Sequence, residues 1–470
     1  MASHRAEPAM GMAPSLRDSA VALYGDGLTT ELPVALEELR QQFGELAPVE
    51  IAPGVAAWVV LSYNLNQRVL RDPARFPRDP RRWREAREGR ATPEAVPGPF
   101  WYFRNALASD EPDHSRYRAV IVDALTAITA SGARLAVREI ATELLAAHAP
   151  TGRADLIADY AFRLPLLLLN RYFGLAGDQG EELVGLMRQV WDGRRSAEQA
   201  RLGLFNYAQA VTAQRRGLPG TDIVSRMVAH PNGLDDEEVA HQLILVISAA
   251  HDPLMNLIAN ASHTLLTDRE FRSSVAGART RVEDAIDVVL WRCPPITLLP
   301  GRYAAADMVL EGARLREGDC LIPGYGPTHA DPRVSPQASP SGLSGHRAHL
   351  AFGTGPHQCP ARNLARQIGI DAVEALLSLL PDLDLAVAPH TLTWRRSPFA
   401  HGLERLPVTF SPTTIDTPGT APLHTTGATS WPHAPTQSSS PLDAPTHRHA
   451  NSTRRGRWRA WCSKVWRFGR

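Results

Sequence analysis

Cysteine is scarce in this sequence, and its few cysteines follow no known pattern. They form no CxxC pair and have no regular spacing, which argues against a structural zinc site and against a disulfide framework. So few cysteines fit a reducing compartment, and we therefore expect a cytoplasmic protein. The cysteines are Cys293, Cys320, Cys359 and Cys462.

The sequence also lacks a bias of charge and a long apolar run. Its formal net charge is +1, so global electrostatics give no indication of a nucleic-acid partner or a membrane surface. The N-terminal segment has no apolar core of the kind that marks a signal peptide. We find no run of about 18 apolar residues and expect no transmembrane helix.

What the sequence does contain is a large, mainly helical body between two ends that are predicted to be disordered. The ends are residues 1–22 and 413–470, the second of them rich in Pro, Thr, Ser and His. Hydrophobic residues make up 44% of the chain, and no clean break divides residues 23–412, so we expect one domain there. Short strands are expected near 49–63 and 296–326. The predicted fold class is mainly α with a small β portion.

A very long helix is predicted for residues 234–268. Asp235 is a good N-cap, and Glu238 three residues later completes a capping box. A helix of this length in a globular protein must run through the whole body, so we expect it to be central.

The stretch "AFGTGPHQCPARNLAR" places Cys359 just before a predicted helix and just after two glycines. The helix dipole and the free N–H groups at a helix start lower the pKa of a thiol. A thiolate on such a turn could be a nucleophile, with His357 as its base. It could equally be a haem ligand, since glycines let a flat macrocycle approach the backbone. A buried structural cysteine is the third interpretation.

The segment "FGTGPHQCPA" resembles the haem-binding loop of the cytochromes P-450, Phe-Gly-x-Gly-x-His-x-Cys-x-Gly/Ala. The resemblance implies that Cys359 ligates the iron of haem b as a thiolate. It also implies a P-450 fold, with haem between the long central helix and the cysteine loop with its following helix. The matching positions are Phe352, Gly353, Gly355, His357, Cys359 and Ala361.

The resemblance covers roughly residues 23–412, which would form the haem domain. "DEPDHSRYRAVI" resembles the third helix of the family, which implies that His114 and Arg118 meet a haem propionate. Being four residues apart, the two would share one helical face. Arg302, in "PGRYAAADMVLEG", and His357 would be the other propionate partners.

One family motif is missing before the Pro294-Pro295 turn. The helix there usually carries Glu-x-x-Arg, an ion pair that braces the haem loop. Counting back from the prolines places Val288 and Trp291 at the two positions, and Arg292 is turned about 100° to another face. We therefore expect packed apolar groups in place of the pair, a change that can be neutral for stability. The segment resembles an actinobacterial branch of the family in which this element ends in tryptophan.

The long helix departs from the family as well. Its usual Ala-Gly-x-Asp/Glu-Thr provides an acid and an alcohol on the distal side of the haem. Here the alcohol position is Pro253, which cannot donate a proton and is expected to kink the helix. Proton delivery would then fall to Asp252, His251 or ordered water.

The resemblance implies a monooxygenase that uses O2 and electrons from ferredoxin and ferredoxin reductase, ultimately from NAD(P)H. Its substrate would be a small organic molecule. The missing alcohol supports an alternative, a haem-binding P-450-fold protein without monooxygenase activity, either an accessory partner or a peroxide-using enzyme. A haem-free enzyme with a cysteine nucleophile is a further alternative. Three segments would enclose the substrate: 101–103, 296–299 and 399–401.

The end of the chain, "RRGRWRAWCSKVWRFGR", is basic and aromatic. A helix would place Trp458, Trp461, Val465 and Phe468 on one face. Basic residues opposite such a face suit weak contact with an anionic membrane surface or an acidic partner. The alternative is an extension without a role.

Overall fold

The computed structural model describes most of the chain between residues 16 and 417. The described ranges are 16–24, 32–96, 100–175, 177–191, 197–268, 272–273, 281–329, 331, 333–334, 346–395, 397 and 399–417. Two compact units are distinguished, Met1–Asp416 and Thr417–Arg470. Residues 1–15 and the tail from 418 on, with its basic aromatic segment, lie outside the described residues, so the predictions made for them stay predictions.

The prediction of disorder for residues 1–22 is wrong at its C-terminal end. Leu16 is buried in a hydrophobic cluster, and strand β1 (Val21–Ala22) pairs in parallel with strand β2 (Leu46–Ala52). The burial of Leu16 and the pairing of β1 thus give residues 16–22 a defined structure. The local sequence did not predict it, because few apolar residues surround these positions along the chain.

The first unit is mainly helical, as predicted. Its α-helices are α1 (Leu32–Phe43), α2 (Tyr63–Arg71), α3 (Arg84–Arg87), α4 (Asp113–Leu125), α5 (Ala130–Ala146), α6 (Arg163–Tyr172), α7 (Gly177–Trp191), α8 (Ala197–Gly217), α9 (Ile223–Ala229), α10 (Asp236–Thr267), α12 (Val282–Arg292), α13 (Tyr325–His329) and α15 (Arg362–Leu379). Shorter turns of helix are η1 (Pro80–Arg82), η2 (Ala149–Thr151), the π-helical η3 (Leu156–Ala161) and η4 (Pro389–Thr391).

The β portion is small and forms three sheets. The largest has the order β1-β2-β3-β8-β5, and the others are β4-β10-β9 and the hairpin β6-β7. In the largest sheet β3 and β8 are parallel, while β8 and β5 are antiparallel. The remaining strands are β3 (Val55–Val60), β4 (Arg153–Asp155), β5 (Arg302–Tyr303), β6 (Met308–Leu310), β7 (Ala313–Leu315), β8 (Cys320–Pro323), β9 (Asp384–Leu385) and β10 (Pro407–Thr409).

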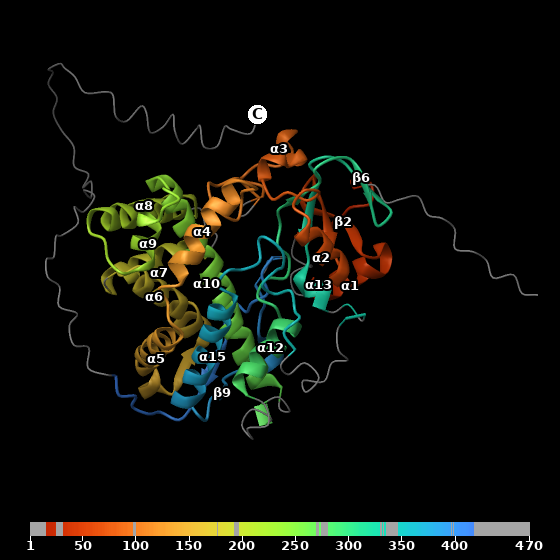
Figure 1. Ribbon diagram of the computed structural model, residues 1–470. Coiled ribbons are helices and arrows are strands. Elements are labelled where there is room, and N and C mark those ends of the chain that lie inside the picture. Colours follow the sequence, from red (N-terminus) through yellow and green to blue (C-terminus); the bar gives the residue numbers. More distant parts are fainter. Residues whose placement is uncertain are drawn as a thin grey trace, which may run out of the picture. The chain divides into compact units, whose positions relative to one another are not determined.

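Helix α10 is the central element of this unit. It begins with the predicted capping box of Asp235 and Glu238 and continues through Pro253 to Thr267, so the proline does not end it. Figure 1 shows α10, in green, passing beside α15, in blue, and the two helices are in contact. Within that contact, Gly369 of α15 lies against the side chain of Leu257 of α10.

Helix α10 is also apolar enough to be compared with a membrane span. Within the described residues it is long and apolar enough to cross a membrane, and α4 with α5 would pass the same test if that pair, bent by 72°, were one span. The window passes on its mean hydropathy although it contains polar residues, and buried core helices pass the same test. Because 56% of the relevant α10 window is buried inside the protein, its apolar residues are accounted for by the core.

Candidate functional site

The Cys359 loop joins the extended residues 346–350 to helix α15. Gly353 and Gly355 have φ angles of +68° and +76°, which residues other than glycine rarely adopt. A Cβ atom at Gly355 would also collide with the carbonyl oxygen of Leu70. The Cys359 N–H donates to the Phe352 carbonyl at 2.9 Å, and this bond closes the loop as a rigid turn.

The thiol of Cys359 is partly buried just ahead of Ala361, the N-cap of α15. Burial raises the pKa of this thiol, and the N–H of Ala361 and the charge of Arg118 offset only part of the effect. The sequence predicted a lowered pKa, and for the polypeptide by itself that is wrong because desolvation outweighs the helix start. A thiolate at this buried position would need a bound cation to stabilise it.

The predicted propionate partners come together from separate parts of the chain. The rings of His114 on α4 and His357 in the loop lie 4.0 Å apart. Arg118, also on α4, donates from Nη2 to the carbonyl of Gln358 at 2.7 Å. Burial, together with the charges of Arg302, Arg78, His114 and Arg118, holds the pKa of His357 far below its usual range.

A fifth cation, Arg78, was not predicted from the sequence. Its side chain is 2% exposed, and its Nε donates to the carbonyl of Leu107 at 3.0 Å. It stands among other arginines in "RFPRDPRRWREAR", and no motif or spacing distinguishes it from its exposed neighbours. Only the path of the folded chain brings it to the site.

Several donors of this cationic cluster are buried without a hydrogen-bond partner among the described residues. A buried donor left unpaired costs about 1–3 kcal/mol. Carboxylates of a bound group would satisfy these donors, and haem carries two such propionates. The residues present therefore fit haem, with Cys359 as the iron ligand. The unpaired donors are Nη2 of Arg78 and Nε and Nη2 of Arg302. Nε2 of His114 is also without a partner among the described residues, while Nδ1 of that ring lies 3.0 Å from Oε1 of Glu111.

The brace of the loop differs from the prediction. Asp287 on α12 is fully buried and accepts two hydrogen bonds from Arg366 on α15, at 2.6 and 2.8 Å. Arg347 donates to the same carboxylate at 3.3 Å. The expectation that apolar groups replace the acid at Val288 is thus corrected, because a carboxylate remains one position earlier. Counting back from the prolines placed the acid position at Val288, one residue after Asp287.

Trp291 is the second brace, and here the predicted apolar replacement is present. Its Nε1 donates to the carbonyl of His346 at 2.6 Å, and its ring packs 4.9 Å from that of His329. His329 Nε2 in turn accepts the N–H of Leu350 at 2.7 Å. These contacts fix the extended residues that lead into Phe352, on the side of the loop opposite α15.

The two distal candidates on α10 have different surroundings. Asp252 is partly exposed and accepts from Arg395 Nη1 at 2.9 Å and from Asn256 Nδ2 at 3.3 Å. His251 is fully buried, with Nε2 3.2 Å from the carbonyl of Phe162, and burial lowers its pKa to about 4. The structure does not bring the two side chains together, and their catalytic roles stay predictions.

Two of the three segments expected to enclose substrate are in contact, because the N–H of Thr297 donates to the carbonyl of Phe399 at 2.9 Å. Phe100, next to 101–103, lies edge-on to Phe399 with ring centroids 5.7 Å apart. The role of these segments in enclosing a substrate stays a prediction.

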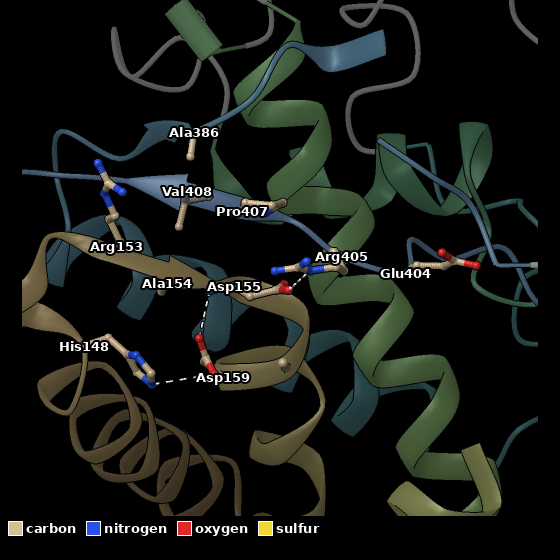
Figure 2. Close-up of a pocket in the computed structure, with 11 residues that line it drawn as sticks. His148, Arg153, Ala154, Asp155, Asp159, Ala386, Glu404, Arg405, Pro407 and Val408 are labelled. Atoms are coloured by element: carbon tan, nitrogen blue, oxygen red, sulfur yellow. Dashed lines mark hydrogen bonds and ion pairs between the residues drawn. The ribbon is translucent and has the colours of Figure 1, made fainter. Parts of the chain in front are cut away.

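Two surface pockets differ in their relation to this site. The larger, of about 710 Å³, lies beside β4 and β10 (Figure 2) and has none of the predicted site residues in its lining. There Arg405 pairs with Asp155 at 3.0 Å and His148 with Asp159 at 3.7 Å, so those charges satisfy one another. The smaller, of about 380 Å³, has His114 and His357 in its wall and so adjoins the cationic cluster.

Comparison with known proteins indicates the same family as the sequence of the Cys359 loop. No protein-family model matches the sequence. The polyketide biosynthesis cytochrome P-450 PksS of Bacillus subtilis is 30% identical over 319 residues, 65% of this chain and 77% of that protein. The mycinamicin IV hydroxylase/epoxidase of Micromonospora griseorubida is 30% identical over 397 residues, 79% and 95% of the two chains. The solved structure of PksS superposes with a TM-score of 0.72 at 25% identity, covering 82% of this chain and 98% of that one.

Proposed function

The chain belongs to the cytochrome P-450 family of monooxygenases, and from that membership we propose that it inserts one atom of O2 into a small, secondary-metabolite-like organic substrate. The observation that carries the proposal is the closed glycine turn that holds Cys359 near buried arginines whose guanidinium groups keep donors without a partner among the described residues. Relatives named for polyketide biosynthesis and for mycinamicin hydroxylation support the substrate class.

Haem b would be held by Cys359 at its iron and by four side chains at its propionates, the guanidinium groups of Arg118 and Arg302 and the imidazoles of His114 and His357. When bound, it supplies the activation of O2 by two electrons, with the second oxygen atom leaving as water. Phe352, Gly353, Gly355 and Ala361 shape the turn that presents the thiolate.

Proton supply is the task left to the chain on the distal side. Asp252 is the partly exposed carboxylate beside Pro253, and we assign it the proton transfer that an alcohol usually assists. Its bond with Arg395 orients it and must loosen when the carboxylate takes up a proton. His251 is buried against Phe162, so we assign it no direct part in the proton transfer.

Electrons would reach the protein from NAD(P)H through ferredoxin reductase and ferredoxin, in the cytoplasm. A second candidate function is favoured by Pro253 and by the pairing of Asp252 with Arg395. In that case the protein keeps its haem but serves as an accessory partner or uses peroxide, because neither task needs protons delivered to O2.

The test begins with the spectrum of the reduced carbon monoxide complex, which reports haem and thiolate ligation together. Turnover is then measured with ferredoxin, its reductase and NADPH on a panel of macrolides such as mycinamicin IV, and in parallel with hydrogen peroxide alone. Product formed only with NADPH and the redox partners supports the monooxygenase. Product formed only with peroxide, or none with a thiolate-type spectrum, favours the second function. A purified protein without a haem absorption band would refute both.

A further inference from the structure

Two buried guanidinium groups lie close together at the propionate side of the site. Arg78 and Arg302 are 2% and 0% exposed, and the charge of Arg78 is one cause, after burial, that lowers the pKa of Arg302 to about 9. Two like charges in a region of low dielectric are unfavourable unless an anion joins them.

Each of these guanidinium groups is anchored along one edge only. Arg78 Nε donates to the carbonyl of Leu107 at 3.0 Å, and Arg302 Nη1 donates to the carbonyl of Phe76 at 3.2 Å. Nη2 of Arg78 and both Nε and Nη2 of Arg302 have no partner among the described residues. The anchors fix the planes of both groups and leave these donors for something outside the chain.

The neighbouring carboxylate does not meet this demand. Asp110 influences both arginines electrostatically, but its oxygens already accept the backbone N–H groups of Arg78 at 2.6 Å and of Asp79 at 3.1 Å. The other groups acting on Arg78 are Tyr325, Tyr303 and Cys320, and these are neutral because burial raises the pKa of each.

We propose that Arg78 is a further haem-binding residue, which binds a propionate jointly with Arg302. The proposal rests on the haem assignment of the proposed function and adds a cation to it. A guanidinium offers its donors in a planar fork that matches a carboxylate. The pair would hold the propionate more firmly than Arg302 alone.

An added cation beside the haem has an electrostatic consequence besides retention. Reduction adds an electron to the haem, and a nearby positive charge stabilises the reduced form more than the oxidised form. Arg78 therefore raises the reduction potential, and its removal lowers it. A purely structural arginine would change thermal stability without this signature.

The test uses the purified holoprotein and three variants. Arg78→Gln removes the charge, Arg78→Lys keeps the charge but loses the planar fork, and Arg75→Gln removes an exposed charge three residues earlier as a control. Haem transfer to excess apomyoglobin and the potentiometric reduction midpoint are measured for each. For Arg78→Gln we expect transfer about ten- to a hundredfold faster and a lower midpoint. For Arg78→Lys we expect faster transfer with a midpoint near wild type, and for Arg75→Gln no change.

The possible outcomes separate this inference from the one it rests on. A wild-type protein without haem refutes the proposed function itself. A haem-loaded wild type with the same transfer rate and midpoint as Arg78→Gln refutes the role of Arg78 and leaves the proposed function standing. If Arg78→Gln does not fold, Arg78→Lys decides, because transfer as slow as wild type would exclude the joint propionate clamp.

Discussion

Asp287 of α12 and Arg366 of α15 form a doubly hydrogen-bonded, buried ion pair across the two helices that flank the Cys359 loop. Arg347, which donates to the same carboxylate, belongs to the residues that enter the loop, whereas Arg366 belongs to the helix that leaves it. One carboxylate thus holds both ends of the loop.

Asp287→Asn should destabilise the protein strongly. The change leaves the half-buried Arg366 without its counter-charge, and breaking a buried pair on one side costs about 3–5 kcal/mol. We expect a lower unfolding temperature of the holoprotein and partial loss of the thiolate-type carbon monoxide spectrum. Asp284→Asn, one turn earlier on α12, is the matched control. Equal unfolding temperatures of the two variants would contradict a bracing role.

Cys359→His should abolish the thiolate-type carbon monoxide spectrum, because it replaces the sulfur ligand by a nitrogen ligand. Cys293→Ala and Cys320→Ala should retain the spectrum, since neither cysteine lies in the loop. Reduced carbon monoxide difference spectra of the three proteins check this. An unchanged spectrum in Cys359→His would end the assignment of the iron ligand.

Pro253→Thr should improve the coupling of NAD(P)H oxidation to product. It restores a hydroxyl donor at the alcohol position of α10 and the N–H that proline lacks. The measurement is peroxide released per NAD(P)H consumed, in both forms, with a substrate that is turned over. Equal or greater leakage in the threonine variant would show that the protein uses another proton route.

Asp252→Asn should lower product formation about 10²- to 10⁴-fold, the range expected when a positioned acid–base group is lost, with the carbon monoxide spectrum unchanged. His251→Gln should have a much smaller effect, because His251 faces the carbonyl of Phe162. Rates of product formation under saturating ferredoxin compare the two. A larger loss in His251→Gln would reverse the assignment.

The stability of the fold should decrease on acidification between about pH 6.5 and 4. Burial lowers the pKa of His251 to about 4, while an unfolded histidine has a pKa near 6.5. The unfolded state therefore takes up the proton first, and the stability present above pH 6.5 is lost as the pH falls. Urea unfolding at several pH values should show a shallower acid loss for His251→Gln than for wild type. His390→Gln, at an exposed position, should match wild type, and a wild-type slope in His251→Gln would contradict this cause.

The parts of the site that the sequence predicted are those that lie close together along the chain. The Cys359 turn with its glycines and the capping box of α10 are formed by residues within a few positions of one another. Their spacing can therefore be recognised in the sequence. Arg78 and Asp287 depend on where distant elements meet. In the sequence, Arg78 resembles the exposed arginines around it, and only the fold places it beside Leu107 and Arg302. Asp287 takes the position of the family's acid because of where α12 ends, and counting from the prolines does not show this.

The segments predicted to enclose the substrate and the brace of the cysteine loop come from different pieces of chain. The meeting of Phe100, Thr297 and Phe399 uses none of the residues that hold Cys359 or pair with Asp287. Because of this division, a residue in one of the predicted substrate segments can be exchanged while the brace of the loop stays intact. Selectivity can therefore change without loss of the cofactor. A library randomised at 101–103, 296–299 and 399–401 should consist mostly of haem-loaded proteins that differ in the molecules they accept, which makes this chain a suitable scaffold for directed changes of selectivity.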